Sequence, residues 1–436
     1  MQLLEQTQSL DFPAPLPQTL LAVKQHFDAP RPADVMDATR RAFGENGLLD
    51  QITPGASVAV GVGSRGIANL ALIVRTVIQQ LRAAGAQPFV VPAMGSHGGG
   101  TAGGQRAVLA ELGVTPESVG AEIRATAEVM QIGQIPEGPP LFQDEVSASA
   151  DHTLLINRVK PHTDFHGRIE SGLAKMAVIG LGGRRGATAM HAHGPAAFPR
   201  FLTSAAPIYA ANTNLLGGLA ILENAHDETT AIVGLIASEM GGTREEELRE
   251  RARALMASLP FPEIDVLVVH RIGKNISGTG MDTNIIGRSM IPRQPEEPGG
   301  PDIAVIAVLD LTDESHGNAV GIGLANVTTT RVAKKIDWVS TYTNAVTSAI
   351  ACMHRASLPI TMADDRRAIQ VAVRGCGQPY EAARIVLIRD TLTLDHLWVS
   401  PSLRPAVEAH PRLSALDEMP FTFSQDGTMT SPWQLT

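Results

Sequence analysis

Short apolar runs alternate with helical patterns along much of this chain, and this alternation restricts the possible folds more than any other feature. Residues 56–62 and 88–92 form two such apolar runs, and residues 68–84 between them carry apolar side chains at helical spacing. Gly85 follows at the place where a helix C-cap belongs. Strand, helix and strand in this order predict a βαβ unit with parallel strands.

The same alternation continues into the C-terminal half of the chain. We expect further elements of both kinds, namely strands at residues 151–157, 265–269 and 303–309 and helices at residues 105–112 and 245–259. The segment from Pro260 to Pro262 is a candidate domain boundary, because a charged helix ends there and a new set of strands begins.

The sequence therefore predicts an α/β fold of two α/β domains with mostly parallel sheets and an active site in the cleft between them. The N-terminal domain, residues 1–260, holds the candidate catalytic residues, and the C-terminal domain, residues 261–400, closes over them. Whether residues 401–436 rejoin the first domain is left open. The most linker-like segment is PRQPEEPGGP, at residues 292–301.

Charge and composition exclude several classes of partner. The net charge of -9 leaves no polybasic surface for nucleic acid or an anionic membrane, and aromatic residues, at 4%, are too scarce for binding by stacking. Cys352 and Cys376 are too few for a disulfide framework or a cysteine zinc site, so we expect both to be buried as small apolar residues. No signal peptide or membrane helix is visible, and a cytoplasmic protein is expected.

The first glycine-rich motif is GVGSRG, residues 61–66, between a predicted strand and a predicted helix. This is the context of the dinucleotide fingerprint GxGxxG, in which backbone N–H groups bind phosphate. The fingerprint also requires an acidic residue after the next strand, where this sequence reads FVVPAMGSHGG. We therefore favour a phosphate or carboxylate site at Ser64 and Gly66, with Arg65 as the bidentate cation. NAD binding and a plain tight turn are the alternatives.

The second glycine-rich loop, MGSHGGGTAGG at residues 94–104, contains His97. It follows a predicted parallel strand, where α/β proteins form ligand sites, and its small residues let a ligand approach the backbone closely. Long glycine-rich loops inside compact domains are more often functional than idle. A surface histidine in a flexible loop is the alternative.

Histidines and cations are concentrated between residues 159 and 194, in the segment VKPHTDFHGRIESGLAKMAVIGLGGRRGATAMHAHG. The histidines are His162, His166, His191 and His193. Histidine moves protons near neutral pH and is the commonest ligand for nickel, zinc and copper. Lys175 lies in an apolar sequence, where burial would lower its pKa and make it a candidate covalent anchor. An exposed or paired lysine is the alternative.

Taken in order, these motifs resemble those of the nickel-dependent lactate racemase family. That family has an arginine in its first strand-to-helix loop, a histidine in a glycine-containing loop, a Pro-His, a Ser-Gly-x-x-Lys and a further histidine downstream. The matching positions here are, in the same order, Ser64-Arg65, His97 in GSHGG, Pro161-His162, Ser171-Gly172-Leu173-Ala174-Lys175 and His191. The C-terminal segments RIGKNISGTGMDTNIIGR and GNAVGIGLANVTTTRVAKKIDW also look like segments of family members, so the resemblance covers most of the chain.

The resemblance implies a 2-hydroxy acid racemase or epimerase that uses nickel in a pincer cofactor, pyridinium-3,5-bisthiocarboxylic acid mononucleotide. By that resemblance Lys175 forms the covalent link to the cofactor and His191 binds nickel. His97 and His162 form the acid/base pair on opposite faces of the substrate, and Arg65 binds substrate carboxylate or cofactor phosphate. The implied partners are a small anionic hydroxy acid and the enzymes that synthesise the cofactor.

The chemistry of hydroxy acids is consistent with this set of residues. The α-hydrogen is barely acidic, because the adjacent carboxylate is already negative. Removing the hydroxyl proton with a histidine while hydride leaves to an electrophilic cofactor avoids a carbanion. Two histidines, one on each face, suit a reaction that runs in both directions.

The sequence departs from the family's pattern in three places: Leu173-Ala174 stand where a Gly-Arg pair is usual, the segment from His162 to Lys175 is longer and adds His166 and Arg168, and His193 competes with His191 as the nickel ligand. Arg168, Arg184 and Arg185 indicate a more anionic or polar substrate than lactate, with exposed arginines as the alternative.

The C-terminal half contributes further candidates for contact with the substrate. Lys274 and Thr279 lie in HRIGKNISGTG, a loop that could close over the site, and Asp282 and Asn284 are weaker candidates. His226, His270 and His316 are assigned structural or rim positions.

Three other functions use the same residues. They are an NAD-dependent dehydrogenase built on GVGSRG, a zinc or other divalent-metal hydrolase built on the histidines from His162 to His193, and a non-catalytic protein that binds small anions.

Overall fold

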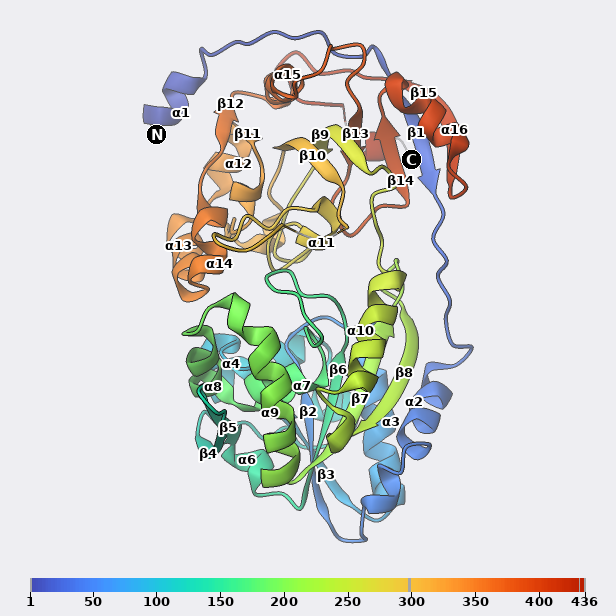
Figure 1. Ribbon diagram of the computed structural model, residues 1–436, viewed down its shortest axis with the longest axis vertical. Coiled ribbons are helices and arrows are strands. Elements are labelled where there is room, and N and C mark those ends of the chain that lie inside the picture. The colour runs from blue at the N-terminus through green and yellow to red at the C-terminus, as the bar shows by residue number, and fades with distance from the viewer. Residues whose placement is uncertain (1, 297–298, 431, 435–436) are drawn as a thin grey trace. The chain divides into compact units, whose positions relative to one another are not determined.

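The computed structural model describes residues 2–296, 299–430 and 432–434, and the chain divides into two compact units. Unit 2 comprises residues 28–256, whereas unit 1 combines the chain up to residue 27 with the chain from residue 257 onward. In each unit helices pack around a central sheet (Figure 1). The predicted α/β fold class with mostly parallel sheets is confirmed.

Unit 2 is built on a five-stranded sheet in the order β3-β2-β6-β7-β8. Its strands are β2 (Ser57–Val62), β3 (Gln87–Pro92), β6 (His152–Arg158), β7 (Leu215–Glu223) and β8 (Thr229–Ile236). Only β8 runs antiparallel to its neighbour. The chain passes from β2 to β3 on one side and later returns to β6 on the other. The carboxyl ends of β2 and β6 therefore form a topological switch point, where ligand sites of such sheets lie.

Helices cover both faces of this sheet. α2 (Val35–Gly44) and α3 (Leu70–Ala83) pack against the face that carries Val58 and Val60. α9 (Phe198–Asn212) and α10 (Thr243–Leu255) contribute to the core on the opposite face, around Ala59. Successive residues of a strand point to opposite faces, which is why adjacent residues such as Val58 and Ala59 enter different cores.

Shorter elements complete unit 2. They are α4 (Ala102–Glu111), α5 (Pro116–Val119), the hairpin of β4 (Val129–Gln134) and β5 (Pro140–Asp144), α6 (Glu145–Ala148), α7 (Leu173–Lys175), a π-helix (Met176–Leu181) and α8 (Gly183–His191).

Unit 1 is built on an eight-stranded sheet in the order β12-β11-β10-β9-β13-β14-β1-β15. The first five strands are parallel, and β14, β1 and β15 are antiparallel to their neighbours. The strands are β1 (Thr19–Gln25), β9 (Glu263–Val269), β10 (Asp302–Val308), β11 (Val327–Thr329), β12 (Ile360–Met362), β13 (Ile385–Ile388), β14 (His396–Val399) and β15 (Leu413–Pro420). Its helices are α1 (Gln2–Thr7), α11 (Thr283–Ile286), α12 (Thr330–Lys335), α13 (Trp338–Thr347), α14 (Ile350–Met353), α15 (Asp365–Gly375) and α16 (Arg404–Ala409).

The two units differ in their bounds from the predicted domains. The C-terminal segment, whose place the sequence left open, groups with the chain from residue 257 onward, because its strand β15 pairs with β1 and both belong to unit 1. The N-terminal 27 residues also belong to unit 1, since β1 lies between β14 and β15. The charged helix predicted to run to residue 259 ends at Leu255. Of the linker-like segment 292–301, Glu297 and Pro298 lie outside the described residues.

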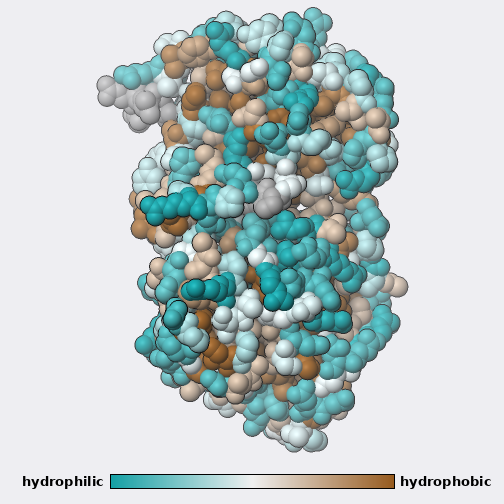
Figure 2. Space-filling model, viewed as in Figure 1, coloured by the Kyte–Doolittle hydropathy of each residue, from teal (hydrophilic) through white to brown (hydrophobic). Residues whose placement is uncertain are grey.

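The surface carries both kinds of residue. On the face shown in Figure 2, hydrophilic residues predominate and hydrophobic ones form separate patches. Cys352 and Cys376 are both buried, as predicted. In the part of the chain that the structure describes, no helix combines the length and the hydropathy that a bilayer span requires.

Candidate functional site

The candidate residues of unit 2 follow neighbouring strands at one edge of its sheet. Arg65 comes after β2, His97 after β3 and His162 after β6. These three strands are adjacent and parallel, so their carboxyl ends meet at the same edge, beside the switch point. The sheet thereby brings together residues separated by almost 100 positions in the sequence.

The GVGSRG motif does not have the geometry of a dinucleotide fingerprint. Gly61 lies within β2, where an added Cβ would come within 2.7 Å of Cδ2 of Leu155, so strand packing explains this glycine. α3 begins only at Leu70, after Asn69 in the left-handed region at φ 60°. The N-terminus of α3 therefore starts four residues beyond Gly66 instead of opening at the motif, as pyrophosphate binding by this fingerprint requires.

The loop after β2 is anchored to β7. The backbone N–H of Ala68 donates to Oε1 of Glu223 over 2.6 Å, and the other carboxylate oxygen of Glu223 pairs with Arg158. Arg65, by contrast, makes no hydrogen bond or ion pair with any residue the structure describes, and its side chain is exposed. Although solvent reaches this side chain, nearby protein removes part of the hydration of the guanidinium; this loss and the charge of Arg158 lower the pKa of Arg65, while Asp164 acts in the opposite direction. Arg65 thus remains available for an anion.

The loop that carries His97 has an unusual backbone that only glycine accepts easily. Gly95, Gly98, Gly99 and Gly100 all have φ between 62° and 68°. The buried amide of Gln105 donates to the carbonyl of Gly95 over 3.0 Å and ties the loop to α4. The loop is therefore a defined turn, which argues against the alternative of a flexible surface loop.

A hydrogen bond joins this loop to the loop after β2. Oγ of Ser64 lies 2.7 Å from Nδ1 of His97. Solvent reaches part of the imidazole, yet loss of hydration lowers its pKa from 6.5 to about 4, and the charges of Arg65, Lys175 and His191 add to this effect. His97 is therefore neutral at pH 7.

His162 is half-buried, and contacts of its backbone and its ring hold it in place. Its backbone N–H donates to Glu170 over 2.7 Å, and the backbone N–H of Asp164 donates to its Nδ1 over 3.1 Å. Its ring stacks on Phe165, with centroids 4.1 Å apart and an interplanar angle of 21°. Burial lowers its pKa well below the usual 6.5, and nearby cations, Lys175 foremost, lower it further.

Glu170 organises the loop around His162. Its side chain is fully buried, accepts a hydrogen bond from the backbone of His162, and lies 3.2 Å from Nδ1 of His166. It also pairs with Arg249 at 3.2 Å and Arg253 at 3.5 Å. Burial alone would raise the pKa of Glu170, but the hydrogen bonds and the charge of Arg249 outweigh it and lower the pKa. Both arginines come from α10, so this helix holds the His162 loop in place.

Lys175 is positioned by a second buried carboxylate, that of Glu245 in α10. Glu245 is buried and accepts two backbone hydrogen bonds. One comes from the N–H of Ala174 at 3.1 Å, at the start of the helical segment that carries Lys175, and the other from the N–H of Gly241 at 2.7 Å. Burial raises the pKa of Glu245. An added Cβ on Gly172 would come within 2.2 Å of this carboxylate, which explains the glycine of the Ser-Gly-x-x-Lys motif.

The environment of Lys175 destabilises its charged form. Burial lowers its pKa from 10.5 to about 8; Arg65 contributes in the same direction, and Asp164 and Glu170 oppose it. Nζ lies 5.5 Å from the centroid of the Phe165 ring. Lys175 and His162 therefore contact the same aromatic side chain.

His191 and His193 have different surroundings. His191 ends α8, its ring lies 5.0 Å from that of Phe198, and Phe198 stacks on Phe165 at 4.9 Å. Burial lowers the pKa of His191, the charge of Lys175 adds to the shift, and Asp164 opposes it. His193 instead meets the ring of Phe201 edge-on at 5.0 Å. The structure therefore brings His191 to the cluster formed by Arg65, His97, His162 and Lys175.

Other predicted contact residues are engaged elsewhere. Arg168 is exposed and pairs with Glu246 at 2.8 Å, which raises its pKa. Lys274 and Thr279 belong to unit 1, where Nζ of Lys274 donates to the carbonyl of Gly278 over 2.6 Å. Thr279 is buried, and its hydroxyl donates to a backbone carbonyl over 2.7 Å. Their contact with substrate stays a prediction.

The remaining candidates have structural surroundings. Asp282 caps α11 by accepting the backbone N–H of Asn284 over 3.0 Å. His270 packs against Trp433, with ring centroids 5.1 Å apart, and His316 occupies a turn at φ 47°. Arg184 and Arg185 are exposed, as is His226.

No group of three or more histidine, cysteine, aspartate or glutamate side chains within the described ranges could hold a metal ion. A hydrolase that relies on three protein ligands has no such constellation there.

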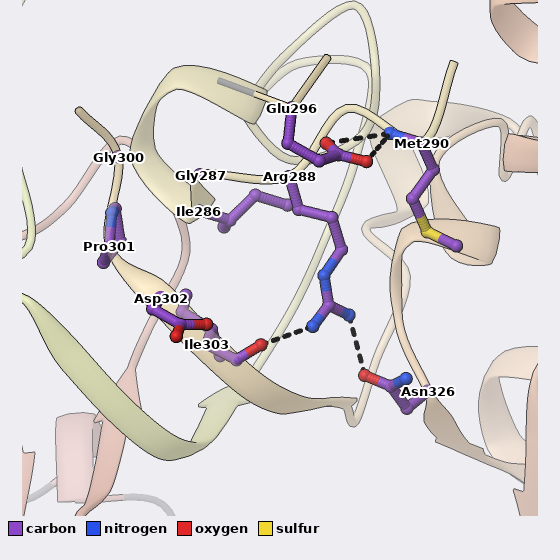
Figure 3. A pocket seen from close by; sticks show the side chains of 10 residues that line it. All are labelled: Ile286, Gly287, Arg288, Met290, Glu296, Gly300, Pro301, Asp302, Ile303 and Asn326. Carbon is purple, nitrogen blue, oxygen red and sulfur yellow. Dashed lines mark hydrogen bonds between the residues drawn. The ribbon is translucent and has the colours of Figure 1, made fainter. Parts of the chain in front are cut away.

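A cavity of about 430 Å³ lies in unit 1, and the cationic side chain that lines it already binds groups of the fold. Its guanidinium, Arg288, donates to the carbonyl of Ile303 over 2.6 Å and to Asn326 over 2.7 Å (Figure 3).

Sequence reasoning missed the residues that hold the cluster together. Phe165 and Phe198 link His162, Lys175 and His191, and Glu170 and Glu245 fix the loops that carry them. The signal available for Phe165 was its position three residues after His162, within a polar segment. The buried glutamates gave no signal, because they resemble the other acidic residues of a charged helix or loop.

Comparisons with known proteins found similarity at the level of structure alone. No protein-family model and no curated protein matches the sequence. The lactate racemase apoprotein from Thermoanaerobacterium thermosaccharolyticum is similar over 66% of this chain and 69% of its own, with 12% identity and a TM-score of 0.46. A structural-genomics protein from Thermotoga maritima is similar over 65% of this chain and 72% of its own, with 13% identity and a TM-score of 0.45. Similarity at this level carries no conclusion about function.

Proposed function

We propose that this protein is a racemase or epimerase that inverts C2 of a 2-hydroxy acid with the aid of a nickel-pincer nucleotide attached to Lys175. The observation that carries the proposal is the grouping of Lys175 with His97, His162 and His191 beside the carboxyl ends of parallel strands in one sheet, where the pKa of Lys175 is lowered to about 8. These are the positions at which the motifs resemble the lactate racemase family.

The residues present fit the implied cofactor. A lysine with a pKa of about 8 has an appreciable neutral fraction near neutral pH, and the neutral amine is the form that makes a covalent bond. Burial and Lys175 lower the pKa of His191, which favours the neutral imidazole that binds a metal. Arg65 and the backbone of the glycine loop could hold phosphate or carboxylate. When bound, the group supplies an electrophilic carbon that accepts hydride from C2 and returns it.

The chain's own residues perform the remaining tasks. Arg65 holds the carboxylate of the hydroxy acid, and a neutral histidine takes up the hydroxyl proton as hydride leaves C2. His97 and His162 are both neutral at pH 7, because burial and nearby cations lower their pKa. A bound carboxylate offsets part of that positive charge and makes proton uptake more favourable.

The proposal is tested by producing the protein together with the cofactor-synthesis enzymes. We expect an adduct in the intact mass, bound nickel, and C2 inversion of at least one member of a panel of 2-hydroxy and aldonic acids. Lys175→Ala should lose adduct and activity, while Lys334→Ala, at an exposed position in unit 1, should keep both. Full loading and activity in Lys175→Ala would refute the proposal, and tight NADH binding by the unmodified protein would support a dehydrogenase instead.

A further inference from the structure

Helices α13 and α14 lie together at one side of unit 1 (Figure 1) and carry exposed apolar side chains. No large hydrophobic side chain in the described part of the chain is more exposed than those of Val339, at 79%, and Val346, at 67%. Tyr342 is 54% exposed, Met353 59% and Ile350 37%. We call these five residues the α13–α14 face, and we propose that it binds the same face of a second copy of the chain.

α13 is oriented opposite to an ordinary surface helix, which turns its apolar side toward the core. The side chains that it buries are those of Thr341 and Ala345. The hydroxyl of Thr341 accepts the N–H of Ala319 over 3.1 Å and donates to the carbonyl of Gly317 over 3.2 Å, so a polar residue attaches this helix to unit 1. The two valines and the tyrosine of α13 lie on the solvent side. Folding of unit 1 therefore gains little from these apolar side chains, because they bury little area there.

The exposed side chains of α13 form one stripe along the helix. Val339, Tyr342 and Val346 are three and four residues apart, the spacing that places side chains on the same side of a helix. A helix of another molecule can pack its own row of apolar side chains beside such a stripe, as helices do inside proteins. The stripe thus has the form of one half of a helix–helix contact.

The segment that carries the α13–α14 face is attached to unit 1 at both ends. Asp337 caps α13 by accepting the N–H of Ser340 over 3.0 Å. After α14, the buried side chain of Arg355 donates to the carbonyl of Ser289 over 2.8 Å. Between the helices Ala349 has φ 51°, a backbone conformation that persists only where its surroundings impose it. The face is therefore pre-organised, which lowers the entropic cost of binding.

The lack of charge on the α13–α14 face makes a second copy a suitable partner. Residues 338–353, WVSTYTNAVTSAIACM, contain no acidic residue, no basic residue and no histidine. Each chain has a net charge of -9, so two copies repel one another and approach with least repulsion through an uncharged face. A partner recognised by opposite charge would find no group to pair with in this segment.

The polar groups of this surface can pair with identical groups. Thr343 and Thr347 are exposed beside the stripe, and Tyr342 adds a phenol. Each of these hydroxyl groups both donates and accepts hydrogen bonds, so each can pair with the same chemistry on a second copy. A contact related by a two-fold axis, in which both copies use the same surface, therefore leaves no charge buried without a partner.

The area of the α13–α14 face is that of a small specific interface. The exposed parts of its five side chains amount to roughly 500 Å² per chain, within the range of the largest apolar patches on monomers. Two such faces would bury roughly 1,000 Å² before neighbouring residues are added, at the lower limit of specific interfaces. We therefore expect a reversible dimer with a Kd on the order of 10 μM.

Sedimentation velocity of the full chain tests the dimer across concentrations on both sides of this Kd. Val346→Glu should raise Kd by about 10²-fold or more, because it adds a carboxylate to both faces of the contact. Tyr342→Ala adds no charge and should raise Kd by about tenfold. Leu416→Glu, at an exposed position in β15, is the matched control and should leave Kd unchanged. All three variants should keep the thermal midpoint of the unmodified chain, since the side chains are exposed.

Ionic strength and cross-linking identify the partner. Added salt should tighten the dimer, because it screens the repulsion between chains of equal charge. Thr343→Cys labelled with a benzophenone maleimide should cross-link to α13 or α14 of the other chain in a mixture of light and nitrogen-15 chains, while the buried Cys352 and Cys376 stay unlabelled. Cross-links within one chain alone, a monomer at every concentration, a dimer unaffected by both face variants, or dissociation by salt would each overturn the inference.

Discussion

Replacing Lys175 by methionine should stabilise the cofactor-free protein, although Lys175 is the residue on which the proposed function depends. The unfolded chain keeps this lysine protonated up to about pH 10.5, whereas burial lowers the pKa in the folded chain to about 8. Between these pH values the unfolded state binds more protons, so the free energy of unfolding rises with pH across this window. Below pH 8 the full cost of the buried charge remains.

The size of the effect follows from the two pKa values. One pH unit corresponds to about 1.4 kcal/mol, so the difference between 10.5 and about 8 is worth at most about 3 kcal/mol. Because the side chain is only half-buried and keeps part of its hydration, we expect about 1–2 kcal/mol. Methionine has a similar length and no charge, so Lys175→Met should unfold at higher urea concentration at pH 7.

The measurement must report on unit 2. All three tryptophans, Trp338, Trp398 and Trp433, belong to unit 1, so their fluorescence follows the other unit. Hydrogen exchange of β6 and β7 peptides in urea, read by mass spectrometry, follows unit 2 directly. The control is Arg244→Met, which removes one exposed positive charge from α10. A stability gain no larger than the control's, or one that does not shrink between pH 8 and 10, would show that Lys175 is not a buried charge.

Three further predictions concern residues that position the site or would bind its metal. Glu170→Gln should lower the free energy of unfolding by about 3 kcal/mol and speed exchange of the His162 loop, because it leaves the paired arginines without their buried counter-charge; the exposed Glu247→Gln should change neither. Glu245→Ala should cost about 1–3 kcal/mol in urea unfolding, since two buried backbone N–H groups lose their acceptor. In loaded protein, His191→Ala should lose nickel by elemental analysis while His193→Ala keeps it; the reverse pattern would reassign the ligand.

The sequence alone predicted the α/β class and placed Arg65, His97 and His162 each in a segment that follows a strand. These predictions succeeded because strand and helix periodicity and glycine-rich turns are local properties, which short stretches of sequence record. The apolar surround of Lys175 likewise indicated a lowered pKa, and the structure gives about 8.

Tertiary structure alone decided how distant segments meet. The pairing of β1 with β15 joins residues almost 400 positions apart, and nothing in either strand names its partner. Local sequence could not separate His191 from His193, because the difference lies in whether the ring meets Phe198 or Phe201. The amide and the hydroxyl that face His162 and His97 are also products of folding, since hydrogen-bond partners depend on where loops are brought together.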